Sequence, residues 1–276
     1  MVGVSAVTQP PAPGDVAIFA AEGAAFVPTQ HAVGPWDPGQ LHGGAPSALV
    51  VRALQALAPE MQLARVAFEF LGPVPLAPLE VTTSVLKPGK RFQLAEASLS
   101  AGGRTALLAR AVLLRRGEPM ALSEAAAWPD GLPCEGPGES IAQPATGRSE
   151  GGDAGFGLTG MEIRYAGGTR FGGGRSLAWF RLAGPLVAGE QTSAACRAVA
   201  AADFGNGISH VLDFETYLFV NTDLTVTLLR EPEGPWILLD ARTRIAPEGV
   251  GWASSVLHDE RGPIGFAQQT LFVQER

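Results

Sequence analysis

Apolar and polar positions along the chain change their period several times, and each change marks an element. In LHGGAPSALVVRALQALAPE (residues 41–60) apolar residues recur at intervals of three and four, which predicts a helix with a buried face. Pro46 suits an early helical position, and Pro59 ends the run. Two short strand-like runs precede this helix, DVAIFAA and AAFVPT. Three follow it: ARVAFEFLGPVP, then LEVTTSVLKPGKRFQLAEASLSAGGR folding back at KPGK, then TALLARAVLLRR.

The second half of the chain repeats this plan. GMEIRYAGG and GRSLAWFRLAG predict a hairpin, TSAACRAVAAADFGNG predicts a helix stopped by glycine, and three strand runs close the sequence. A shift of 159 positions brings Pro73 onto Pro232 and Gly103 onto Gly262, so that turns meet turns. The pattern predicts an internal duplication. We expect a first domain over residues 1–116, a linker over residues 117–157 that is rich in proline and glycine, and a second domain over residues 158–276.

This plan predicts the fold class. One helix laid against an antiparallel sheet from the same short chain is an α+β arrangement in which the sheet curls around the helix. Two such units can bury edge strands by merging their sheets. We therefore expect two antiparallel sheets, each curled around one central helix and joined into one continuous sheet. The edges that remain favour a homodimer or a higher homo-oligomer.

Composition narrows the class of function. The net charge of −7 and the absence of a basic stripe argue against a nucleic-acid partner. Cys134 and Cys196 have no metal-ligand spacing, so we expect neither a metal nor a cofactor, and a reduced cytoplasmic setting. No apolar run approaches the length of a membrane span, and the first residues lack the pattern of an export signal.

Two stretches carry a resemblance to a known family. The element order, together with GQLHGGAPSALVVRAL and FVNTDLTVTLLREPEGPW, resembles the thioesterase superfamily with the hot-dog fold. The strand NTDLTV, followed by DARTRI, LHDERGPIG and QQTLFV, is similar more narrowly to the duplicated branch, the type II acyl-CoA thioesterases. The resemblance implies a double hot-dog fold and hydrolysis of acyl-CoA to coenzyme A and a carboxylic acid. A protein of the same fold that binds acyl or other hydrophobic ligands without turnover is the alternative.

The resemblance also implies a site in the second half. In the type II enzymes an Asp, a Thr or Ser hydroxyl and a Gln amide, one on each of three closing strands, hold the attacking water. These fall on Asp223, Thr243 and Gln269, with Gln268 as the competing amide. At the shift of 159 the first half has Ala64, Ser84 and Arg110 at these positions, so the set belongs to one copy alone.

Thioester hydrolysis needs a positioned water, a base and donors aimed at the oxygen that becomes negative. Asp223 is the expected base. The unpaired N–H groups at the helix start after Gly43 and Gly44 are the expected oxyanion donors. His42 could pack at the helix entry, cap neighbouring carbonyls or contact the substrate. The DFGNG stretch (residues 203–207) is either a helix stop or a pocket wall that presents Asp203 and Asn206.

Overall fold

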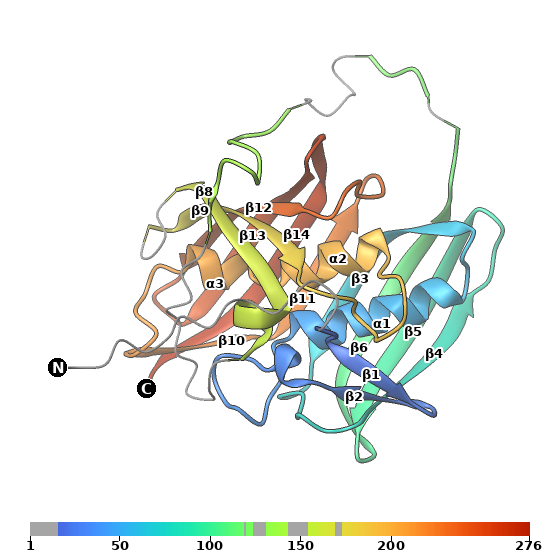
Figure 1. Cartoon of the computed structure of the whole chain (residues 1–276), viewed down its shortest axis with the longest axis horizontal. Coiled ribbons are helices and arrows are strands. Elements are labelled where there is room, and N and C mark those ends of the chain that lie inside the picture. Colours follow the sequence, from blue (N-terminus) through green and yellow to red (C-terminus); the bar gives the residue numbers. More distant parts are fainter. Residues whose placement is uncertain (1–15, 119, 124–130, 143–153, 169–172) are drawn as a thin grey trace.

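The computed structural model describes residues 16–118, 120–123, 131–142, 154–168 and 173–276 (Figure 1). Its first half contains β1 (Phe19–Glu22), β2 (Ala25–Pro28), the short turn η1 (Gln30–Ala32), α1 (Gly44–Ala56), β3 (Met61–Phe70), β4 (Leu79–Lys87), β5 (Phe92–Ala101) and β6 (Arg104–Arg115). The second half contains β7 (Ile141–Ala142), η2 (Phe156–Gly160), β8 (Met161–Gly168), β9 (Arg175–Leu182), α2 (Ala194–Ala202), α3 (Gly205–Ser209), β10 (Tyr217–Asn221), β11 (Asp223–Leu228), β12 (Ile237–Ile245), β13 (Val250–Asp259) and β14 (Gly262–Glu275).

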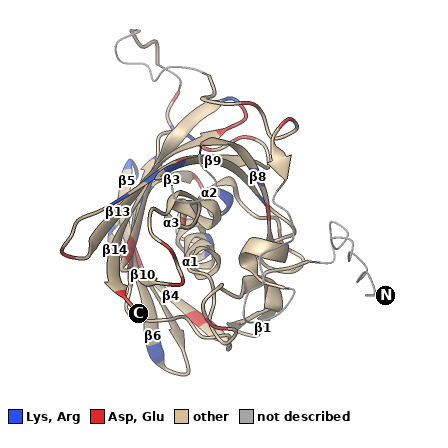
Figure 2. Cartoon of the chain, turned by 90° about the vertical axis from the view of Figure 1, so that its left-hand side faces the viewer, with Lys and Arg blue, Asp and Glu red and all other residues tan. Residues whose placement is uncertain are grey.

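The described strands form one continuous sheet. Its order is β1-β2-β4-β5-β6-β3-β11-β14-β13-β12-β9-β8-β7, with β10 paired to β14. The two halves meet at the antiparallel pair β3–β11, where Val66 lies opposite Val226. Seen along the helices, the sheet wraps around α1, α2 and α3 (Figure 2). This is the expected double hot-dog arrangement, two curled antiparallel sheets joined into one.

The strands confirm the internal repeat and correct its register by one residue. β4 and β12 differ by 158 positions at both ends, and so do β5 and β13. β6 and β14 also begin 158 positions apart. The shift of 159 was therefore wrong by one, and the counterparts of the three predicted site residues are Arg65, Val85 and Ala111. The conclusion that the first half lacks the set still holds.

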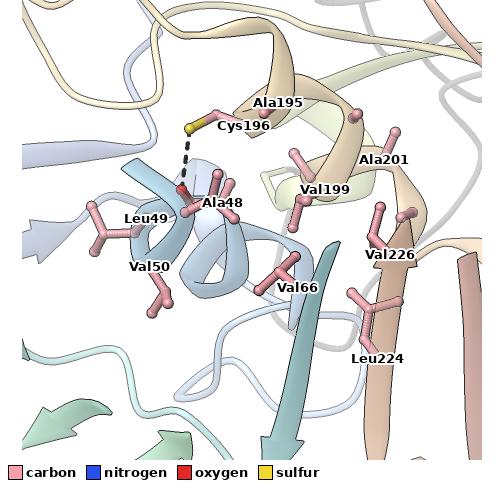
Figure 3. Packing of buried hydrophobic residues seen from close by; sticks show 14 of the residues in the cluster. Ala48, Leu49, Val50, Val66, Ala195, Cys196, Val199, Ala201, Leu224 and Val226 are labelled. Carbon is pink, nitrogen blue, oxygen red and sulfur yellow. Dashed lines mark hydrogen bonds between the residues drawn. The ribbon is translucent and has the colours of Figure 1, made fainter. Parts of the chain in front are cut away.

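The main apolar core runs through both halves because α1 and α2 pack directly on each other, and two smaller apolar clusters lie in the second half. α2 contributes mostly alanine, and Ala195 and Ala201 are almost fully buried. Small side chains allow the two backbones to approach closely, and the thiol of Cys196 donates to the carbonyl of Ala48 over 3.4 Å (Figure 3). On β11, Val226 points into this core because its side chain lies on the face of the strand that faces the helices.

The described part of the predicted linker packs on the second half. The indole Nε1 of Trp179 donates to the carbonyl of Glu135 (2.9 Å), and the guanidinium of Arg164 donates to that of Pro137 (2.8 Å). β7 adds an edge strand beside β8. The segment therefore covers part of the outer face of the sheet, whereas the domain boundaries at residues 116 and 158 stay predictions.

The second helix differs from the prediction at its end. It was expected to run to the glycines of DFGNG, but α2 ends at Ala202, and Gly205 begins the separate helical turn α3. The chain bends at Asp203 and Phe204, which keep helical dihedral angles without continuing α2. None of the helices in the described residues has the length and apolar character needed to cross a membrane.

Candidate active site

A buried carboxylate lies where α2 ends. Asp203 is 6% exposed, and its Oδ1 accepts hydrogen bonds from the side-chain amides of Asn221 (2.9 Å) and Gln269 (3.0 Å). Its Oδ2 lies 3.1 Å from Nδ1 of His42. Burial of a carboxylate is costly unless polar partners surround it, and here they come from three elements, the entry to α1, β10 and β14. The fold therefore gathers a polar cluster around Asp203.

Gln269 is held in one orientation. It is 2% exposed, and its Nε2 donates both to the carboxylate of Asp203 and to the carbonyl of Asp203 (3.1 Å). Its Oε1 accepts from the backbone N–H of Asn206 (3.2 Å). Gly205 makes this approach possible, because a Cβ there would lie 3.0 Å from Oε1 of Gln269. Gln269 is thus the inward-facing amide, while the alternative Gln268 is exposed on the other face of β14.

Thr243 is connected to the carboxylate of Asp203 only through other residues. It is 2% exposed on β12, and its hydroxyl is 2.8 Å from that of Ser209 and donates to Oδ1 of Asn206 (3.3 Å). Asn206 in turn donates its backbone N–H to Gln269. Thr243 therefore anchors α3 to the sheet and reaches Asp203 through two intermediate residues.

The structure does not bring Asp223 to the other two predicted residues. Asp223 begins β11, and its two oxygens accept from the backbone N–H (2.6 Å) and the hydroxyl (3.1 Å) of Thr270. Thr270 follows Gln269 on β14, so its side chain points away from the helices. Within the described residues the side chain of Asp223 forms no hydrogen bond with the side chains of Thr243 and Gln269, and a catalytic role for it stays a prediction.

The two glycines before α1 allow the helix ends to touch. A Cβ on Gly43 would lie 2.8 Å from Oδ2 of Asp203 and 3.1 Å from the ring of Phe70. A Cβ on Gly44 would lie 2.5 Å from the carbonyl of Ala200. The N–H of Gly44 donates to Nδ1 of His42 (3.1 Å), whereas the N–H of Gly43 donates to no acceptor in the described chain. Gly43 therefore has the helix-start donor still available beside the carboxylate.

His42 is packed as well as hydrogen-bonded. Its ring stacks on Phe204 with centroids 4.2 Å apart and lies 5.3 Å from the ring of Phe156. Its side chain is 14% exposed. Of the three roles left open, packing at the helix entry is confirmed. His42 also caps the helix, but its Nδ1 accepts the N–H of Gly44 instead of donating to carbonyls.

The opposite ends of α1 and α2 form a second junction, where the carboxylate of Glu190 is paired with Arg52 of α1 (2.6 Å). Ser193, the N-cap of α2, donates its hydroxyl to Oε1 of Gln55 (2.6 Å) and accepts from the N–H of Cys196. The thiol of Cys196 lies 3.8 Å from the same Oε1. Burial raises the pKa of this thiol to about 11, so it stays protonated at neutral pH. This junction is closed by its own hydrogen bonds and offers no base.

The described residues form two grooves, one lined by the second half and one lined by the first half. The larger, about 610 Å³, lies on the outer face of the sheet around Thr225, Trp252 and Gln268, on the side of the sheet away from the helices. The smaller, about 330 Å³, includes Leu71 at the end of β3. Phe70 comes directly before Leu71, and its ring also touches the Gly43 position beside Asp203. Among the described residues no group of acidic, histidine or cysteine side chains is placed to bind a metal.

The arrangement is suited to base chemistry on a water molecule. One oxygen of Asp203 is fixed by two amides, and the other faces His42 and the start of α1. The family resemblance pointed to Asp223 instead, although the interpretation of DFGNG as a pocket wall already contained Asp203 and Asn206. Asn221 was missed, and its signal was a polar residue two positions before Asp223 in the run FVNTDLTVTLL.

Two family models match the chain in order. The acyl-CoA thioesterase N-terminal domain matches residues 32–115, and the acyl-CoA thioesterase C-terminal domain matches residues 137–273. Together they cover most of the 276 residues. A comparison with curated proteins found no match.

Solved structures share the fold at low sequence identity. A proposed thioesterase II from Thermobifida fusca is 18% identical with a TM-score of 0.72, and the match covers 92% of this chain and 95% of that one. A proposed thioesterase from Novosphingobium aromaticivorans is 21% identical with a TM-score of 0.69, covering 92% and 98%. An acyl-CoA thioesterase II from Mycobacterium marinum is 14% identical with a TM-score of 0.59, covering 86% and 91%. At these identities the likeness concerns the fold.

Proposed function

Because the chain belongs to the acyl-CoA thioesterase family, with both halves of the family pattern present in order, we propose that it hydrolyses acyl-CoA thioesters with Asp203 as the base. The observation that carries this proposal is the buried Asp203 cluster, in which Asn221 and Gln269 fix one carboxylate oxygen. Direct attack by water needs no nucleophilic side chain. The products are coenzyme A and a carboxylic acid.

The steps follow from the positions of the donors. Water attacks the thioester carbonyl carbon while Oδ2 of Asp203 takes one of its protons. The carbonyl oxygen becomes negative, and the N–H of Gly43, at the positive end of α1, is the donor proposed to stabilise it. The carbon–sulfur bond then breaks, and its electron pair leaves on the sulfur of coenzyme A. Thr243 contributes indirectly, by keeping α3 and Gln269 in place.

We propose that the substrate reaches Asp203 past Phe70. Asp203 lines neither of the two grooves, but the ring of Phe70 lies against the Gly43 position, and the next residue, Leu71, lines the smaller groove.

Replacing Asp203 with Asn tests the proposal. The change keeps the size of the side chain and removes the base, so release of free thiol from acyl-CoAs of graded length should fall about 10²- to 10⁴-fold. Asp223→Asn is the matched control and should leave turnover close to that of the original protein. Full thioesterase activity in a folded Asp203→Asn protein would contradict the proposal. Loss of activity in Asp223→Asn alone would assign the catalytic role to Asp223.

The burial of Asp203 favours a second candidate, an acyl-binding protein without turnover. That protein would bind a fluorescent fatty-acid analogue and release no thiol from any acyl-CoA in the series. A homo-oligomeric state, a cytoplasmic location and a place in fatty-acid metabolism stay predictions from the sequence.

A further inference from the structure

The outer face of the second half carries exposed apolar side chains on three neighbouring strands. Val220 of β10 lies opposite Phe272 of β14, and Phe272 lies opposite Val250 of β13. The three side chains are 43%, 48% and 58% exposed, in that order. Trp252 is also exposed and lies two positions after Val250, hence on the same face of β13. Large apolar side chains that gather on one face of a sheet mark an interaction surface.

A second row of outward side chains crosses the same part of the sheet and is charged at its two ends. Glu69 of β3 lies opposite Asp223 of β11, whose carboxylate is bonded to Thr270 of β14. Thr270 lies opposite Trp252, and Trp252 lies opposite Arg244 of β12. The row therefore begins with two acidic side chains, has Thr270 at its centre and ends with a basic side chain.

The end charges of this row are available to a partner. Glu69 and Arg244 are exposed, and neither has a hydrogen-bond or ion-pair partner within the described part of the chain. Arg175, by contrast, is already paired with Asp240 (2.9 Å). The groove of about 610 Å³ lies beside the row and has Trp252 in its wall, so the surface also offers a depression for side chains of a partner.

The two rows share a symmetry about β14 that fits a second copy of the same chain. β10 and β11 lie on one side of β14, and β13 lies on the other. In a two-fold contact, residue i of one copy meets residue j of the other, and j meets i. With the two-fold axis along β14, Val220 meets Val250 of the second copy, and Glu69 meets Arg244 of the second copy. The apolar row is thus complementary to itself in shape, and the charged row is complementary to itself in sign.

We propose that the outer face of β10, β14 and β13 is the interface of a homodimer whose two-fold axis runs along β14. The Phe272 side chains of the two copies meet at its centre, and burial of the apolar row stabilises the contact. Glu69 and Arg244 form an ion pair at each side and fix the orientation, because other arrangements bring like charges together. The Asp203 cluster lies on the other face of the sheet, so this dimer does not depend on the proposed function.

Reversing the end charges tests the orientation of the two copies. Glu69→Arg and Arg244→Glu each place like charges together at both sides of the interface, so either variant alone should dimerise about tenfold more weakly or worse. An equimolar mixture of the two variants should recover the dimer, because opposite charges then meet at both sides. Sedimentation velocity measures the three samples. Unchanged dimers in the single variants, or a mixture that stays monomeric, would overturn the proposal.

A change at the centre of the interface tests the surface itself. Phe272→Glu brings two carboxylates together at the axis and should leave the protein monomeric at concentrations where the original protein is a dimer. Val85→Glu is the matched control, because Val85 is 40% exposed on β4, far from this face. Urea unfolding checks that both variants are folded. An original protein that is monomeric at every concentration, or a dimer that survives Phe272→Glu, contradicts the proposed interface, and so does a monomer that uses this face to bind lipid vesicles.

Discussion

Asp203 and Asp223 show how neighbours decide what a carboxylate can do. Asp203 meets side chains from three elements in the core, and Asp223 is bonded to the backbone and hydroxyl of one exposed residue, Thr270. The family resemblance selects Asp223, but the sequence does not show that the end of α2 lies against β10 and β14. That contact is set by the packing of the helix pair inside the sheet. Gln269 and Thr243 were predicted from the family resemblance, and both side chains are buried on the inner face of the sheet.

Replacing Gln269 with Ala should lower both activity and stability. The change removes the donor to the carboxylate and carbonyl of Asp203 and leaves the N–H of Asn206 without its acceptor. Unmade buried hydrogen bonds of this kind cost about 1–3 kcal/mol. Thiol-release kinetics and urea unfolding measure the two effects. Gln268→Ala, on the exposed face of the same strand, is the control, and an equal loss in it would show that the inward amide has no special role.

Close contact between helix ends governs the structure at the level of elements. Most strand positions and turns followed from alternation, glycine and proline, but the run FVNTDLTVTLLREPEG, predicted as one strand, is divided at Thr222 into β10 and β11. The end of α2 was not predicted correctly, because the bend at Asp203 arises from contacts with β10 and β14 rather than from a local helix stop. The error of one residue in the repeat shift has a similar origin. Turns of similar composition fit either register, and only strand pairing distinguishes them.

Gly43→Ala tests this contact. Its new Cβ would lie 2.8 Å from Oδ2 of Asp203, so the ends of α1 and α2 would have to move apart. We expect a loss of about 1–3 kcal/mol in the free energy of unfolding, as for other overpacked sites, and reduced turnover. Gly207→Ala is matched to it, because that glycine lies in α3 with open space around its Cβ position. Equal stability of the two variants in urea would show that the helix ends can separate freely.

The whole molecule is expected to lose stability under mild acid. Burial lowers the pKa of His31, His210 and His258. The unfolded chain therefore takes up protons near pH 6.5 that the folded chain resists, and stability falls as the pH drops below that value.

Urea unfolding at pH 7.5 and pH 5.5 measures this loss. Asp259 should not affect the difference between these two pH values, because its contribution to stability changes only at lower pH. Burial opposes its ionisation, but hydrogen bonds from Arg230 and from the N–H groups of Glu233 and Arg261 outweigh burial and lower its pKa. Its share of the stability is present above the ordinary carboxyl range and is lost as the pH falls through the lowered value. His258→Gln should reduce the change between the two pH values, and an unchanged difference would contradict the assignment to buried histidines.

The two junctions between α1 and α2 have a consequence for stoichiometry. A duplicated fold offers two related places for chemistry, but the junction of Ser193, Gln55 and Cys196 is closed by its own hydrogen bonds, and the carboxylate beside it, Glu190, is paired with Arg52. Under the proposed function each chain holds one reaction centre for two folding units. The first half serves as the wall and the helix start of that centre, so neither half can be expected to react when separated from the other.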